Sequence, residues 1–246
     1  MSRLKQSIVN IGTGVFGQVC VVIAQYISRM VLVTYLPIEY VGYSGLFTNI
    51  LLVLSLAELG IGTAMTFCLY DPLARGDFGH IRALLEQLKK YYSIIAVVVL
   101  VVGLCAMPFL KYIIWGTPIN HEVRIIYILY LMNTVVSYPF AYKTNLFIAD
   151  QRFSTVNRIK YACMTFVNFT QATLIFLTKS YYLYMAAMII GTFVQNIWIS
   201  KRADKEYAYV FEAQVSQKAL NKSKNILLKN MYAMSLHKLS SVSVLG

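Results

Sequence analysis

Residues 91–115 read YYSIIAVVVLVVGLCAMPFLKYIIW, a stretch with one charged side chain, Lys111. Crossing the roughly 30 Å hydrocarbon core of a bilayer takes about 20 apolar residues in a helix. Five further stretches have the same character, and they cover residues 11–36, 40–69, 124–149, 157–178 and 181–200. Since 58% of the residues are hydrophobic and only 13% are charged, the sequence predicts an all-α polytopic membrane protein with six spans.

The basic residues predict how these spans are oriented. With the N-terminus in the cytoplasm, 17 of the 22 Lys and Arg residues fall in the inner segments. The outer side keeps Lys111, Arg124 and Lys179, and two more lie within spans. Cytoplasmic loops of membrane proteins carry an excess of Lys and Arg, so we expect both termini in the cytoplasm. Anionic membrane lipids explain the net charge of +12 without a nucleic-acid partner.

The organisation of the chain follows from where the apolar stretches stop. Residues 1–200 form a six-helix transmembrane lobe. Residues 201–229 are polar and basic and predict a cytoplasmic amphipathic linker, and residues 230–246 read as the start of a seventh span. A helix that stops within the bilayer leaves carbonyl groups without partners, so we expect the chain to be truncated.

The first inner loop is predicted to span residues 71–90. Asp71-Pro72 is a turn signal at its start. Apolar residues from Phe78 to Leu88 recur at helical spacing beside charged ones, which predicts a short amphipathic helix on the inner membrane surface.

Motifs of soluble enzymes are weak in this sequence. GTGVFG at residues 12–17 matches a dinucleotide-binding fingerprint, but it lies within a predicted span with no strand before it. Small residues one turn apart also let membrane helices pack closely, and this interpretation is favoured. We see no catalytic arrangement and no metal-ligand spacing among the three His and four Cys residues. We therefore expect no enzyme activity, no catalytic or metal site, and no cofactor.

Three ionisable side chains lie well inside predicted spans, away from their ends: Arg29, Glu58 and Lys143. A charge facing lipid at such depth costs roughly 2.5–3.5 kcal/mol or more, so such residues usually face a protein interior or a watery cavity. Plainer explanations remain open. The long stems of Arg29 and Lys143 can carry their charges to the interface, and Glu58 can be a protonated carboxyl bonded to a neighbouring helix. Alternatively, because Gly60 and Gly62 loosen the helix beside it, Glu58 is expected to bind a coupling ion or to serve as a hinge.

Uncharged polar residues within the spans complete the candidate site. Most of them are expected to hydrogen-bond between helices. Together with the two cations they also suit a hydrated cavity able to hold sugar and phosphate. The predicted substrate-binding residues are Arg29, Lys143, Asn49 and Asn145.

Four segments resemble bacterial polysaccharide flippases of the multidrug/oligosaccharidyl-lipid/polysaccharide superfamily. They read RMVLVTYLPIEYVGYSGLFTNIL (29–51), LAELGIGTA (56–64), LYDPLA (69–74) and YKTNLFIADQR (142–152). The resemblance implies a fold of 12–14 helices in two six-helix lobes, of which this chain supplies the first. It also implies export of undecaprenyl-diphosphate-linked oligosaccharide across the cytoplasmic (inner) membrane by alternating access, for O-antigen, capsule or a related polymer.

The resemblance implies roles for individual residues as well. Arg29 and then Lys143 are expected to contact the diphosphate, and Glu58 to couple transport to a proton or sodium gradient. The expected partners are the lipid-linked oligosaccharide, bacterial membrane lipids, and a missing C-terminal lobe or a second copy of the chain. An alternative is a non-transporting structural or regulatory partner of a polysaccharide assembly complex.

Overall fold

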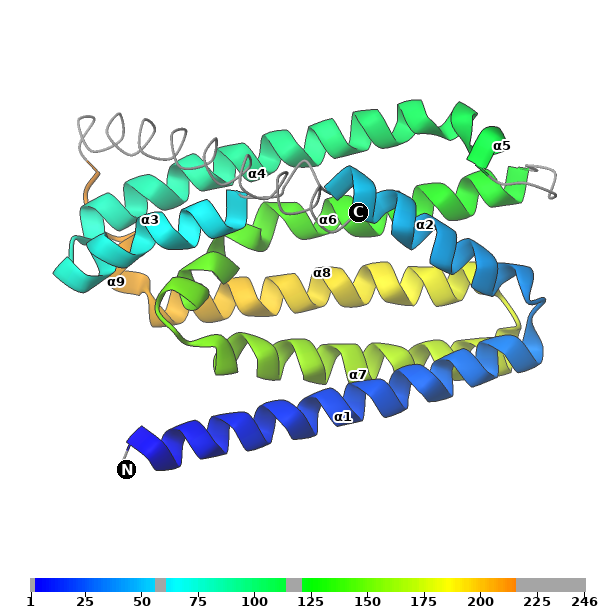
Figure 1. Cartoon of the computed structure of the whole chain (residues 1–246), viewed down its shortest axis with the longest axis horizontal. Coiled ribbons are helices and arrows are strands. Elements are labelled where there is room, and N and C mark those ends of the chain that lie inside the picture. Colours follow the sequence, from blue (N-terminus) through cyan, green and yellow to red (C-terminus); the bar gives the residue numbers. More distant parts are fainter. Residues whose placement is uncertain (1–2, 56–60, 114–120, 216–246) are drawn as a thin grey trace, which may run out of the picture. The chain divides into compact units, whose positions relative to one another are not determined.

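The computed structural model describes residues 3–55, 61–113 and 121–215, and every regular element in these ranges is helical (Figure 1). The elements are α1 (Arg3–Tyr35), α2 (Glu39–Ser55), α3 (Ile61–Arg75), α4 (Phe78–Ala106), the 3₁₀ turn η2 (Met107–Phe109), α5 (Leu110–Ile113), α6 (His121–Ala149), α7 (Phe153–Thr178), α8 (Tyr181–Glu206) and α9 (Ala208–Phe211). The predicted all-α fold class is confirmed.

Five helical segments are long and apolar enough to cross a bilayer. They are Gly14–Tyr35, Phe78–Tyr112, His121–Ala149, Phe153–Thr178 and Tyr181–Glu206, and each matches a predicted span. The predicted span 40–69 differs, because its described residues belong to two shorter helices of 17 and 15 residues, α2 and α3. Residues 56–60, between those helices, lie outside the described part of the chain. The protein is a polytopic membrane protein with five such segments among its described residues.

The structure corrects the interpretation of residues 71–90. Asp71 and Pro72 do not begin a loop, because α3 continues through them to Arg75. The segment from Phe78 to Leu88 is not a separate surface helix, because it forms the first turns of the 29-residue helix α4. Its apolar side chains Ile81, Leu84, Leu85 and Leu88 are at most 2% exposed. An amphipathic pattern looks the same whether its apolar face meets lipid or protein, and here it meets protein.

A two-residue link joins α3 to α4. Gly76 has a φ of +67°, the left-handed region that glycine adopts without a steric penalty. The Asp77 N–H donates to the Pro72 carbonyl at 3.0 Å, and the Gly76 N–H donates to the Leu73 carbonyl at 3.3 Å. This pair of bonds is a Schellman motif, which ends α3. Asp77 then caps α4, since its Oδ1 accepts from the His80 N–H at 3.0 Å.

Replacing Gly76 with alanine is expected to lower the free energy of unfolding by about 1 kcal/mol, because an L-residue at positive φ brings Cβ close to the backbone. Thermal unfolding of the purified protein in detergent measures this change. Gly45→Ala is the matched control, because Gly45 lies inside α2 with no atom within 4 Å of a Cβ. Alanine is a better helix former than glycine, so the control is expected to be neutral or stabilising. An equal loss in both variants would contradict this account of Gly76.

Close contacts divide the chain into two compact units, each with its own core. Unit 1 comprises residues 1–52, 100–137 and 154–196, and unit 2 comprises residues 53–99, 138–153 and 197–246. The helices α4, α6 and α8 therefore contribute residues to both units.

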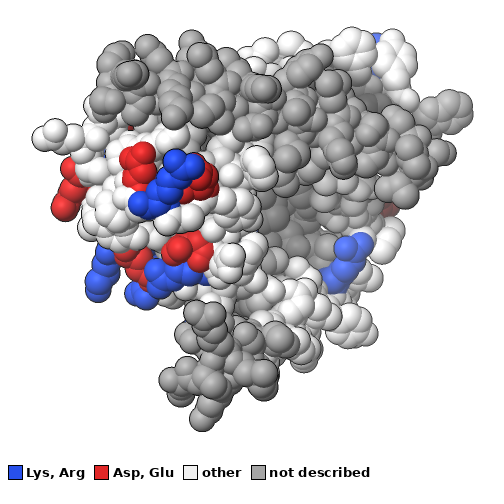
Figure 2. Space-filling model, turned by 60° about the vertical axis from the view of Figure 1, so that its left-hand side comes forward, with Lys and Arg blue, Asp and Glu red and all other residues white. Residues whose placement is uncertain are grey.

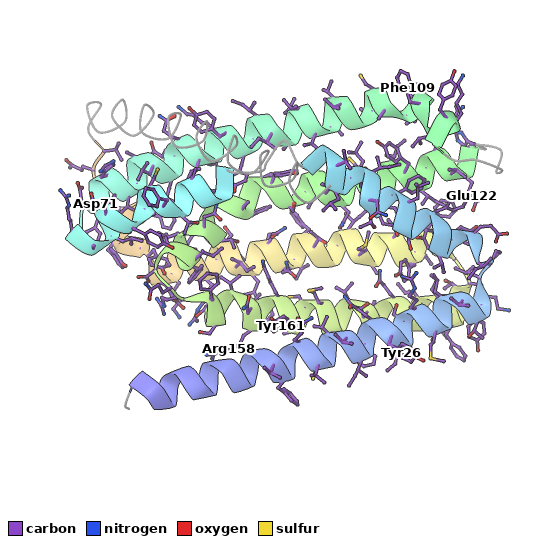
Figure 3. All side chains as sticks on the ribbon, in the orientation of Figure 1. Tyr26, Asp71, Phe109, Glu122, Arg158 and Tyr161 are labelled. Atoms are coloured by element: carbon purple, nitrogen blue, oxygen red, sulfur yellow. The ribbon has the colours of Figure 1, made fainter. Side chains whose placement is uncertain are left out.

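Unit 1 contains an aromatic cluster built from α2, α6 and α8. Phe47 is fully buried, and its ring centroid lies 5.9 Å from that of Tyr130. The Tyr130 hydroxyl lies 2.9 Å from the Tyr181 hydroxyl, so each of these buried phenols has the other as a hydrogen-bond partner. The Tyr40 hydroxyl donates to Glu122 in the first turn of α6 (Figure 3). These contacts hold the beginnings of α2, α6 and α8 together.

Unit 2 pairs basic with acidic side chains around the end of α8. Glu206 pairs with Arg152 at 2.7 Å and also with Arg202. The Tyr207 hydroxyl donates to Asp150 Oδ2 at 2.8 Å. Burial, together with this carboxylate neighbour, raises the pKa of Tyr207, so the phenol stays protonated and remains a donor. Figure 2 shows basic and acidic side chains next to one another on the surface that it presents.

The C-terminal boundaries differ in part from the prediction. The last span was predicted to end at residue 200, whereas α8 continues to Glu206 and takes in the start of the predicted linker 201–229. The short helix α9 follows it. Residues 216–246, which hold the rest of that linker and the predicted seventh span, lie outside the described residues.

Candidate functional site

Unit 1 contains a cavity of about 520 Å³ lined mainly by α1, α7 and α8. Arg29 is its one charged lining residue, and the structure places no acidic side chain in the described lining. The uncharged polar residues that line it are Gln25, Tyr26, Ser44, Asn168, Gln171, Tyr184, Thr192 and Gln195. Apolar residues including Leu32, Val167 and Met188 complete the walls. The cavity thus combines one fixed positive charge with several neutral hydrogen-bonding groups.

Helix α1 places Arg29 in this cavity through its periodicity. Gln25, Arg29 and Leu32 follow one another at spacings of four and three residues, so they share one face of the helix. Arg29 lies six residues before the end of α1 at Tyr35, about 9 Å along the axis. Tyr26, which Figure 3 labels on α1, belongs to the same lining. No ion pair involves Arg29 within the described ranges.

The polar side chains of α7 and α8 are held by hydrogen bonds within unit 1. Gln171 is 3% exposed, and its Nε2 donates to the Tyr184 carbonyl at 3.2 Å. The Thr192 hydroxyl donates to Asn133 Oδ1 of α6 at 2.8 Å. Such bonds between helices fix the orientation of the side chains. The side-chain oxygens of Gln171 and Thr192 can still accept hydrogen bonds from a ligand in the cavity.

Close packing of α7 against α8 forms one wall of the cavity. A Cβ on Gly191 would lie 2.1 Å from Val167 Cγ2 and 3.3 Å from Val167 Cβ. Real Cβ atoms do not approach other atoms so closely, and a valine side chain on a helix cannot rotate away freely. Gly191 therefore sets the spacing of these two helices, as small residues do elsewhere in membranes.

Replacing Gly191 with alanine is expected to destabilise the protein by about 1–3 kcal/mol, because the extra methyl group overpacks the contact with Val167. Thermal unfolding in detergent measures the loss. Adding Val167→Ala removes the Cγ2 atom that the new Cβ would meet at 2.1 Å, so the double variant is expected to recover most of the stability lost. If Gly191→Ala unfolds like the unmodified protein, or Val167→Ala brings no recovery, the contact does not set the spacing.

Gly17, the last glycine of the GTGVFG segment, packs α1 against α7. A Cβ at this position would lie 2.5 Å from Tyr161 Cδ2, and Figure 3 labels Tyr161 on α7. Gly12 and Gly14 have no atom within 4 Å of a Cβ. The packing interpretation of the motif therefore holds for Gly17.

The predicted site residues fall in different parts of the structure. Arg29 lines the cavity, whereas Lys143 and Asn145 belong to unit 2 and are absent from its lining. Asn145 is 8% exposed, and its Nδ2 donates to the Tyr92 hydroxyl at 2.9 Å. Asn49 lies exposed on α2 and is also not part of the lining. Glu58 lies outside the described residues.

Lys143 is engaged by side chains of α8. Its Nζ lies 2.6 and 2.7 Å from the two carboxylate oxygens of Asp204 and 2.7 Å from the Ser200 hydroxyl. The ammonium also lies 5.3 Å from the centre of the Phe211 ring. The Lys143 side chain is 11% exposed and that of Asp204 is 51% exposed. This geometry ties α6 to α8 within unit 2.

The sequence analysis did not assign most of the cavity residues to the site. Gln25, Tyr184, Thr192 and Gln195 received no role, although Gln171 and Asn168 were recognisable as polar residues within a span. A usable signal was present, because Tyr184, Met188, Gly191 and Gln195 recur at spacings of four, three and four residues along α8. That spacing puts them on one face of a helix. Because this face carries a glycine, Gly191, and a polar residue, Gln195, it differs from a lipid-facing surface.

Comparisons of the chain with protein-family models, with curated proteins and with solved structures each found no match. The proposed function therefore rests on the geometry of the Arg29 cavity and on the sequence.

Proposed function

We propose that this chain is a transport protein that binds an anionic, lipid-linked oligosaccharide in the Arg29 cavity and moves it across the cytoplasmic membrane. The observation that carries the proposal is the composition of the cavity: one arginine, no acidic residue in the described lining, and many uncharged polar groups. The resemblance of residues 29–51 to the first hairpin of polysaccharide flippases supports the same substrate class.

The chemistry of such a substrate matches the lining. A diphosphate needs a cation when it leaves water, and a guanidinium binds phosphate oxygens through two parallel hydrogen bonds. Sugar hydroxyls both donate and accept hydrogen bonds, as do the amides of Gln25, Gln171 and Gln195. The apolar outer surfaces of the five candidate spans suit the lipid environment in which the substrate is anchored.

The orientation and the partners belong to the same proposal. The bias of Lys and Arg favours a cytoplasmic N-terminus. Alternating access requires two lobes that rock about a central site. We therefore expect transport to depend on a second six-helix lobe, which is either a further lobe or a second copy of this chain. The chain acts as a carrier and not as an enzyme.

Binding to a defined lipid tests the proposal. The purified chain in lipid nanodiscs is titrated with a polyprenyl diphosphate that carries a short oligosaccharide, and in parallel with the corresponding uncharged polyprenol. Saturable binding of the diphosphate with no saturable binding of the polyprenol is expected, because the charge-bearing group is what Arg29 recognises. Equal behaviour of the two lipids would refute the proposal.

A further inference from the structure

Lys160 lies on the face of α7 that lines the Arg29 cavity. Met164, Val167 and Gln171 follow it at intervals of four, seven and eleven residues, and all three are lining residues. Such intervals return to the same face of an α-helix. Lys160 is the eighth residue of α7.

The register of α7 against α8 gives the depth of Lys160. The two helices run antiparallel and side by side (Figure 1), and Gln171 Nε2 contacts the Tyr184 carbonyl. Counting eleven residues from this contact toward the start of α7 leads to Lys160, and counting eleven residues toward the end of α8 leads to Gln195. Gln195 lines the cavity, so Lys160 lies level with the end of the cavity that is marked by Gln195.

Arg29 lies near the other end of the same cavity. The Tyr35 and Phe176 rings lie 5.5 Å apart. Six residues earlier on the two helices are Arg29 on α1 and Thr170, next to Gln171, on α7. The Gln171 side chain contacts Tyr184. Eleven helical residues correspond to about 17 Å, so roughly this distance along the bundle separates the level of Arg29 from that of Lys160. The cavity therefore has one cation in its lining near Tyr184 and a second cation beside its opposite end.

The surroundings of Lys160 leave its charge uncompensated. The residue is half-buried, and the described part of the chain supplies no acidic partner for it. Removing an ammonium from water without a partner is costly, so a position of this kind favours an anionic ligand. Arg158, two residues earlier, provides a contrast. It lines a separate groove on the Tyr161 side of α7 together with Gly17 (Figure 3).

We propose that Lys160 is a second binding residue for the anionic group of the transported lipid, at the end of the cavity opposite Arg29. This inference rests on the proposed function and adds a second contact point to it. The anionic group meets Lys160 at one end and Arg29 at the other, and uncharged amides, including Gln195 and Gln171, lie between them. With the N-terminus in the cytoplasm, the Lys160 end is the cytoplasmic end, where a substrate made in the cytoplasm enters.

Affinity measurements on paired variants test the role of Lys160. The full chain in nanodiscs is titrated with polyprenyl diphosphate bearing a short oligosaccharide, and the unmodified protein is compared with Lys160→Gln, Lys160→Arg and Arg158→Gln. Lys160→Gln is expected to bind about tenfold more weakly, whereas Lys160→Arg, which keeps the charge, stays within about threefold. Arg158→Gln is the matched control on the opposite face of the same helix, and it is expected to stay within about twofold.

The outcomes separate the two proposals. If Lys160→Gln binds as tightly as Arg158→Gln while Arg29→Ala binds weakly, Lys160 has no role and the proposed function stands. If Arg29→Ala binds as tightly as the unmodified protein, the proposed function itself fails. A misfolded Lys160→Gln would be recognised by its thermal unfolding, and in that case weak binding by a folded Lys160→Arg would overturn the inference, whereas retained binding would support it.

Discussion

Replacing Arg29 with alanine is expected to weaken binding of a polyprenyl diphosphate by between about tenfold and about a hundredfold. A hydrogen bond to a charged group contributes about 1.5–3 kcal/mol, and each 1.4 kcal/mol corresponds to a factor of ten in affinity. Among the described residues that line the cavity, Arg29 is the one charged side chain, so none of the others in this lining can replace its charge. Titration of the variant in nanodiscs measures the effect, and export of the lipid-linked glycan is expected to fall with it.

Two further variants make this experiment specific. Arg124→Ala removes an exposed arginine of unit 1 that does not line the cavity, and it is expected to bind as the unmodified protein does. Arg29→Lys keeps the charge but loses the planar pair of donors, so intermediate affinity is expected. If both alanine variants bind equally well, Arg29 is not the contact for the head group.

How far the sequence predicts this structure depends on the physical signal behind each feature. Five of the six spans predicted from apolar runs match long apolar helices among the described residues, because a bilayer imposes a minimum length on every segment that crosses it. The boundaries were less certain, since backbone hydrogen bonds continue a helix through charged residues as readily as through apolar ones. Helix α4 therefore starts at Phe78 instead of residue 91, and α8 ends at Glu206 instead of residue 200.

The site could be predicted only in part for a related reason. Arg29 was found because a charge within a span is costly and hence informative. Lys143 satisfied the same criterion, but its partner Asp204 lies beyond the predicted end of the last span. Ser200 already lay in the predicted span, but only the extension of α8 past residue 200 brings Asp204 to the ammonium, and that depends on tertiary structure. A charge within a span thus marks a residue that needs a partner, and for Lys143 that partner is a side chain of the protein itself.

Replacing Asp204 with alanine is expected to lower the free energy of unfolding by about 1–3 kcal/mol. The substitution leaves the Lys143 ammonium, whose side chain is 11% exposed, with only the Ser200 hydroxyl as a polar partner. A stranded buried cation costs more than the lost attraction alone, although the half-exposed position of Asp204 admits water and moderates the loss. Thermal unfolding of the purified variant in detergent measures this effect.

The double variant Lys143→Met/Asp204→Ala decides what Lys143 is for. Methionine fills a similar volume without a charge, so removal of Asp204 on this background is expected to cost less than about 0.5 kcal/mol. If the pair serves only to tie α6 to α8, the double variant also binds the polyprenyl diphosphate as the unmodified protein does. If it folds normally but binds tenfold more weakly, Lys143 contacts the substrate and must leave Asp204 to do so. We expect normal binding, because Lys143 already has two carboxylate oxygens and a hydroxyl within 2.7 Å and is absent from the lining of the Arg29 cavity.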